Sequence, residues 1–212
     1  MMNELQKRDC PITFELTPSG IQFLSVKMNI NNDCFEFSPS SVMSEQFGAI
    51  VSALYSLFQE NDDMHNEWNS CEYLSNENHE IYREITKVEW DNEGEVVEIF
   101  LSRKLVNKID CEKDLLNIEI RNYDQILKSY TVRTKDFCYA VAKACTEVLK
   151  EYGFYGYRYS TEYDYFRIHQ LLYIKAFALG NFEARDFINN NSNKLEKRTS
   201  FEKEIELLLF DM

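Results

Sequence analysis

The sequence predicts an α+β fold in which an antiparallel sheet of about five to seven strands packs with two main helices, and C-terminal helices are added. Short segments rich in β-branched and aromatic residues recur between turn residues, and two longer segments carry apolar residues at helical spacing. A hydrophobic content of 44% supplies a sizeable core. We expect a single α+β domain over 1–190 and a C-terminal helical appendage over 191–212 that packs on it.

Seven segments predict strands because they are short and are punctuated by turn residues. They are Ile12–Leu16, Ile21–Ile30, Cys34–Phe37, Glu80–Trp90, Glu95–Ser102, Leu115–Arg121 and Gln125–Arg133. The turn residues Asp91–Gly94 and Asn122–Asp124 each join two of these segments, which predicts two hairpins. Consecutive hairpins favour an antiparallel sheet.

The helices are predicted from apolar spacing and from end signals. The expected helices are Pro39–Gln59, Lys135–Tyr152, Phe166–Leu179 and a final helix that begins at the capping box Thr199–Glu202. Gly153 is expected to end the second helix, because glycine readily adopts a positive φ. Asn189–Arg198 is the best candidate for a linker before the last helix.

The charge balance bears on the class of partner. The chain has a formal net charge of −13, and Met28–Tyr82 contains ten acidic residues and no Lys or Arg. Nucleic-acid affinity comes largely from Lys and Arg that neutralise phosphates, so an acidic chain disfavours nucleic acid and anionic membranes. Six glycines in 212 residues leave little material for phosphate-binding loops, and we expect no cofactor.

The segment Glu60–Glu80 is predicted to be an exposed loop, because it shows no periodicity and is rich in Asn, Asp, Glu and Ser. Two aromatic residues lie among its acids. The candidate partner-binding residues of this segment are Asp62, Asp63, Glu67, Trp68, Glu72 and Tyr73. Aromatic anchors surrounded by charge are typical of protein interfaces, although a charged run is also typical of a plain solvated surface.

A second group of candidates lies in the tyrosine-rich segment Gly153–Phe166. Tyr155, Tyr157 and Tyr159 alternate with Gly156 and Arg158, which predicts a strand with tyrosines on one face. Tyrosine and arginine are enriched at interface hot spots, whereas packing at the edge of the core is the alternative explanation.

Signatures of catalysis and of metal binding are absent from the sequence. His65, Cys71 and His79 fall in one segment, but their spacing matches no structural zinc pattern. No nucleophile motif accompanies the histidines, and His169 sits in a predicted apolar helix as a structural residue. We therefore expect neither an enzyme nor a metal site.

The six cysteines show neither a CxxC pair nor a tight disulfide framework, and no secretory signal or membrane span is visible. These features indicate a cytoplasmic setting with free thiols. Cys138 and Cys145 lie two turns apart on a predicted helix, and we interpret them as core residues.

The order of the elements resembles that of small cytoplasmic bacterial immunity proteins, which are encoded beside polymorphic or contact-dependent toxins. The resemblance rests on Phe37-Ser38-Pro39-Ser40, on the helical stretch Phe47–Leu54, on the acidic loop with its Trp-ended hairpin, and on the helix that closes in Tyr152–Tyr157. It covers the layout of about Ile12–Lys175 and carries over no family residue. It implies a protein that binds and blocks one toxin domain.

The expected function is thus inhibition of a basic protein partner, such as a secreted toxin domain, through an acidic surface that contains aromatic residues. One alternative is a small-molecule-binding or hydrolytic domain that uses carboxylate and tyrosine side chains in a pocket. The other is a structural or regulatory component that forms a homodimer through the tyrosine-rich segment.

Overall fold

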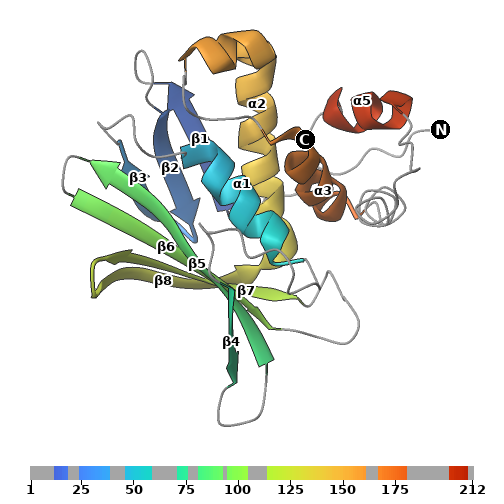
Figure 1. The fold of residues 1–212 in the computed structure, drawn as a ribbon. Helices are drawn as coiled ribbons and strands as arrows, with labels where there is room; N and C mark the ends of the chain where they lie inside the picture. Colours follow the sequence, from blue (N-terminus) through green and yellow to red (C-terminus); the bar gives the residue numbers. More distant parts are fainter. Residues whose placement is uncertain are drawn as a thin grey trace.

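The structure is a computed structural model, and the residues that it describes are 12–18, 24–38, 46–58, 71–75, 81–92, 95–104, 114–160, 167–180 and 201–209. Within these ranges the chain forms antiparallel strands and helices, which confirms the predicted α+β class (Figure 1). The strands are divided between a three-stranded and a five-stranded sheet, whereas the sequence predicted a single sheet. The division falls where a helix separates the third strand from the fourth along the chain.

The three-stranded sheet consists of consecutive antiparallel strands β1 (Ile12–Pro18), β2 (Leu24–Ile30) and β3 (Asp33–Phe37). Its side chains alternate between buried apolar and more exposed polar positions, as expected for a sheet with one face in the core. Ile30 pairs with Asp33 across a two-residue turn in which Asn31 and Asn32 have φ of 51° and 67°. Two positive φ values match a type I′ hairpin turn, and asparagine tolerates that conformation.

The five-stranded sheet has the order β4-β5-β6-β7-β8, so every strand pairs with its neighbour in the sequence. The strands are β4 (Cys71–Ser75), β5 (Ile81–Asn92), β6 (Glu95–Lys104), β7 (Leu115–Asn122) and β8 (Gln125–Arg133). Asn92 pairs with Glu95, and Asn122 pairs with Gln125. Both predicted hairpins are therefore confirmed.

Two helices pack against the sheets. Helix α1 (Gln46–Ser56) contacts β5, and helix α2 (Thr134–Ser160) contacts β1. The predicted start of α1 at Pro39 lies outside the described residues. Gly153 interrupts α2 with φ 63° and ψ 174°, a combination that is essentially restricted to glycine, and helical structure resumes after it. Cys138 and Cys145 of α2 are fully buried and form no disulfide, in agreement with their predicted place in the core.

The C-terminal part contains α3 (Ile168–Ala178), which contacts α1 and α2, and α5 (Phe201–Leu209), which contacts α3. The capping residue Thr199 and the linker candidate Asn189–Arg198 lie outside the described residues. Among the described helices, none combines the length and the apolar character needed to cross a membrane.

Aromatic contacts join the layers into one core. Phe37 of β3 stacks on Trp90 of β5 with 5.9 Å between ring centroids, and this contact connects the two sheets. Phe14 of β1 meets Phe137 of α2 edge-on at 6.3 Å. Such aromatic pairs add directional preference to the apolar area that they bury.

Candidate binding surface

Four of the ten predicted partner-binding residues, Asp62, Asp63, Glu67 and Trp68, lie outside the described residues. Glu72 and Tyr73 lie on β4, where they pair with Glu84 and Arg83 of β5. The prediction of a loop throughout Glu60–Glu80 is therefore wrong over Cys71–Ser75. A strand of five residues carries little alternation of its own, and its conformation is fixed by pairing with β5, which the sequence of the segment does not reveal.

The predicted tyrosine-lined strand is also wrong. Tyr155, Tyr157, Arg158 and Tyr159 belong to α2, which continues past the interruption at Gly153. Alternate residues of a helix lie about 200° apart around its axis, so this spacing does not align three tyrosines as it would in a strand. The short alternation of Tyr with Gly and Arg therefore did not determine the local conformation, and the segment continues as a helix.

Where its side chains are described, the five-stranded sheet has a largely buried inner face and a more exposed outer face. On β6, Val97, Ile99 and Leu101 are buried, while the intervening residues are partly exposed. The same alternation occurs on β7. We define the outer face by its described residues Glu89, Glu98, Phe100, Glu119, Arg121 and Ile126, which occupy positions on β5, β6, β7 and β8.

One row of the outer face places two acids directly opposite each other. Glu89 pairs in register with Glu98, which pairs with Arg121, which in turn pairs with Ile126. Arg121 continues the row beside Glu98, so the row combines two carboxylates with one guanidinium. Glu89 is exposed and Glu98 is partly exposed, so the row presents carboxylates toward solvent.

An arginine and a phenylalanine occupy the middle of this face. The guanidinium carbon of Arg121 lies 4.1 Å from the centroid of the Phe100 ring, and Arg121 Nε donates to Glu119 Oε2 at 3.0 Å. The cation–π contact with Phe100 and the ion pair with Glu119 together hold the guanidinium over the ring. The result is a pre-ordered aromatic–arginine–carboxylate group on a partly exposed surface.

The β7–β8 hairpin adds apolar side chains at the edge of the outer face. Tyr123, Ile126 and Leu127 are 61%, 54% and 41% exposed. The register shifts between the pairs Ile120–Lys128 and Arg121–Ile126, so Leu127 has no partner on β7 and the alternation is broken there. Tyr123 has φ 51°, an uncommon value for a bulky residue, at the first position of the turn.

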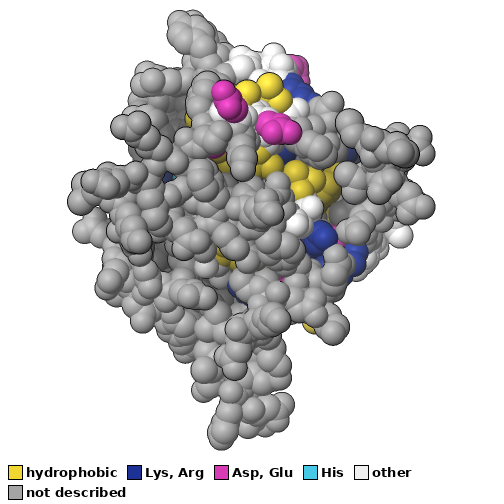
Figure 2. All heavy atoms as spheres, turned by 90° about the vertical axis from the view of Figure 1, so that its right-hand side faces the viewer, with side chains coloured by type: hydrophobic (Ala, Val, Ile, Leu, Met, Phe, Trp, Pro, Cys, Tyr) yellow, Lys and Arg dark blue, Asp and Glu magenta, His cyan; other side chains and the backbone are white. Residues whose placement is uncertain are grey.

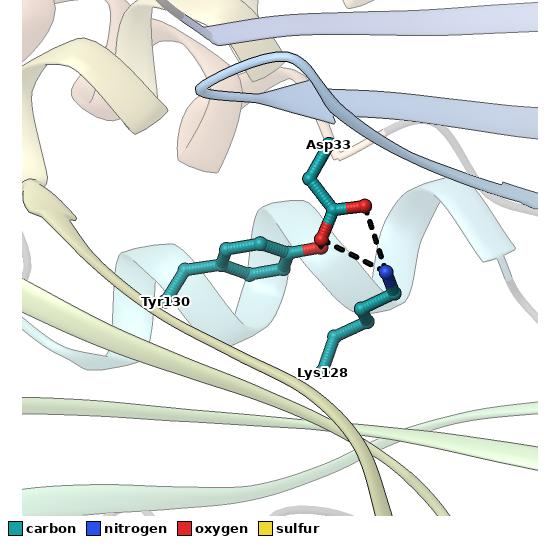
Figure 3. Close-up of polar contacts among 3 residues, drawn as sticks. All are labelled: Asp33, Lys128 and Tyr130. Carbon is teal, nitrogen blue, oxygen red and sulfur yellow. Dashed lines mark hydrogen bonds and ion pairs between the residues drawn. The ribbon is translucent and has the colours of Figure 1, made fainter.

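A polar cluster connects the two sheets on the other side of β8 (Figure 3). Lys128 Nζ lies 2.7 and 2.9 Å from the two carboxylate oxygens of Asp33, and Tyr130 Oη donates to Asp33 Oδ2 at 3.0 Å. Hydrogen bonds from Lys128 and Tyr130 lower the pKa of Asp33. Partial burial and the bond to Asp33 raise the pKa of Tyr130 to about 12. The cluster holds the β2–β3 turn against β8.

A second ion pair lies in the core. Arg103 Nε donates to Asp114 Oδ2 at 2.6 Å, and the side chains are only 4% and 1% exposed. Arg103 Nη1 also donates to the carbonyl oxygen of Leu57, which follows α1, at 3.2 Å. The pair therefore ties the end of α1 to β6 and to the start of β7, which is a structural role.

A buried lysine joins three of the described helices, α2, α3 and α5. Lys175 of α3 is fully buried, and its Nζ donates to Thr146 Oγ1 of α2 at 3.2 Å and to the carbonyl oxygen of Leu208 of α5 at 3.0 Å. Burial, together with the charge of Lys150, lowers the pKa of Lys175 to about 8.

Figure 2 shows the face to the right of Figure 1, where described hydrophobic side chains form a strip bordered by acidic and basic ones.

No group of three or more His, Cys, Asp and Glu residues within the described ranges is arranged to hold a metal ion. His169 contacts the ring of Tyr55 edge-on at 5.3 Å. The sequence reasoning missed the outer face, although Phe100 gave a signal: it is an aromatic residue at a polar position of an alternating strand.

No protein-family model, no curated protein and no solved structure matches the chain.

Proposed function

We propose that this protein is a non-enzymatic binding protein that attaches to a basic protein partner through the outer face of the five-stranded sheet. The observation that carries the proposal is the row Glu89–Glu98–Arg121, in which two carboxylates face each other beside a guanidinium stacked on Phe100. A basic partner would place cationic side chains against these exposed carboxylates and form charge-assisted contacts with them.

The composition of this face suits an interface. Arginine is enriched at hot spots and phenylalanine at interfaces, and the carboxylates of Glu89, Glu98 and Glu119 lie near Phe100 and Arg121 in the sheet. A net charge of −13 would accelerate encounters with a basic protein and make the association sensitive to salt. The acidic residues predicted from the sequence, Asp62, Asp63 and Glu67, would add to the same field.

The immunity-type resemblance specifies the proposal further. It suggests a cytoplasmic bacterial inhibitor that covers the basic active site of a toxin domain encoded nearby. The probe is therefore the C-terminal domain of a secreted toxin whose gene adjoins that of this protein, with binding and inhibition measured together.

The test compares two pairs of substitutions, each of which removes two negative charges. Glu89→Gln with Glu98→Gln removes the opposed carboxylates, and we expect association with the toxin domain to slow by about tenfold at low salt. Glu15→Gln with Glu36→Gln is the matched control, because both residues are exposed on the three-stranded sheet and the net charge changes equally. There Lys27 lies between the two acids in register.

Equal slowing by both pairs would mean that net charge, rather than the outer face, drives the association. Failure of the adjacent toxin domain to bind the wild-type protein would overturn the immunity-type assignment.

A further inference from the structure

The terminal strands β1 and β8 differ in how far the rest of the protein covers them. The terminal strand β1 is covered by α2, and Phe14 packs on Phe137 there. The terminal strand β8 has β7 as its neighbour in the sheet order. From Gln125 to Thr131 none of its seven side chains is buried, and five are exposed. An open edge strand is a ready template for pairing with another strand.

The charge of β8 differs from that of the rest of the chain. Its sequence, Gln125–Arg133, contains no acid, and its two bases are paired with carboxylates of the same chain. Lys128 Nζ lies 2.7 Å from Asp33 Oδ1, and Arg133 Nε lies 2.6 Å from Asp136 Oδ2. The strand is therefore close to neutral in a chain with a net charge of −13. Two copies can approach along this edge with little repulsion, whereas a basic partner gains little from it.

We propose that two copies of this chain pair antiparallel along β8, about a two-fold axis, and thereby join their five-stranded sheets into one continuous sheet. A two-fold axis makes the interface self-complementary, since residue i of one copy faces residue j of the other and the reverse. Main-chain hydrogen bonds between the edges supply the attachment, as in strand addition generally. This inference does not depend on the proposed partner, which uses the outer face.

The side chains of β8 select the register. An axis at Ser129 places Lys128 opposite Tyr130 of the partner subunit and Leu127 opposite Thr131 of the partner subunit. Because Tyr130 donates to Asp33, this arrangement also brings Lys128 toward the partner subunit's Asp33, which extends the polar cluster with alternating charge. An axis at Lys128 would instead oppose two ammonium groups, which is unfavourable. The bulge at Leu127 distorts the strand there, so the pairing between the two copies ends at the Leu127–Thr131 pair.

The test introduces a lysine, and then a complementary glutamate, at two positions that face each other across the axis. Sedimentation equilibrium over a range of protein concentrations measures the dimer Kd. We expect the wild-type protein to be a reversible dimer. Leu127→Lys should raise the dimer Kd by about tenfold, because a lysine on an edge strand disfavours pairing and each dimer contains two such lysines. Adding Thr131→Glu to the same chain should restore association, since each new lysine then faces the partner's new glutamate.

The matched control is Leu209→Lys, the same substitution at a leucine of α5 that is 64% exposed. It should leave the dimer Kd unchanged, and circular dichroism should show that each variant is folded. A wild-type protein that stays monomeric at the highest attainable concentration would overturn the proposal. So would a dimer that Leu127→Lys leaves intact, or a loss of association that Thr131→Glu does not reverse.

Discussion

The pairs Arg103–Asp114 and Lys128–Asp33 have nearly equal N–O distances, 2.6 and 2.7 Å, but they lie in opposite environments. The first pair is almost fully buried, whereas the side chains of Lys128 and Asp33 are 36% and 43% exposed. Burial makes each charge depend on its partner, because neither can return to water without unfolding. In the exposed pair, water and salt screen both charges, so substitution of either residue should change the free energy of unfolding little. Distance alone therefore says little about the importance of an ion pair.

The largest effect is expected from Asp114→Ala, which leaves the guanidinium of Arg103 buried without its counterion. We expect the free energy of unfolding to fall by about 3–5 kcal/mol. Urea denaturation at neutral pH measures the change. Replacing both residues, with Arg103→Met and Asp114→Leu, is the control and should cost much less. A loss under about 1 kcal/mol for Asp114→Ala would show that burial does not distinguish the two pairs.

Lys175 gives an intermediate effect that depends on pH. Its pKa in the folded protein is about 8, below the ordinary value of 10.5, so between these values the unfolded chain binds more protons than the folded chain. This group therefore makes stability rise with pH across that window, by at most about 1.4 kcal/mol per pH unit. Chemical denaturation from pH 7 to 10 should show this rise in the wild-type protein and a smaller one in Lys175→Met. Parallel curves for the two proteins would contradict the prediction.

The smallest effect on stability is expected from Asp33→Asn at the exposed cluster. The urea midpoint should hardly move, because the pair is half exposed and screened by solvent. The pKa of Tyr130 should fall from about 12 toward its ordinary value, since a neutral amide no longer favours the protonated phenol. NMR of labelled tyrosine rings, with Tyr130→Phe to assign the signal, measures this shift. An unchanged pKa would mean that partial burial alone raises it.

Local signals in the sequence located most of the elements. The hairpins at Asn92–Glu95 and Asn122–Gln125 were predictable because turn residues separate segments of β-branched and aromatic character. The part of helix α2 before Gly153 was predictable from its apolar spacing. The interruption of the helix at Gly153 was predictable because glycine readily adopts a positive φ. Each of these elements depends on residues close together in the chain.

What the sequence could not supply depends on distant residues. Asp33 and Lys128 are 95 positions apart, and nothing local indicates that they meet. The division into two sheets and the pairing that forms β4 are likewise set by packing between segments. The row Glu89–Glu98–Arg121 is visible only once the register is known. Sequence reasoning therefore favoured the contiguous acids near Glu67 over acids that lie side by side only in the sheet.

The sheet order described above has a kinetic consequence. In both sheets every strand pairs with the strand that precedes or follows it along the chain. Most backbone pairing therefore closes short loops, and the entropy lost in bringing paired strands together is small. Proteins dominated by such local contacts fold faster than β-proteins whose strands pair across long separations. We therefore expect the docking of the two sheets on each other to be the slower event, and the contact between Phe37 and Trp90 would report it.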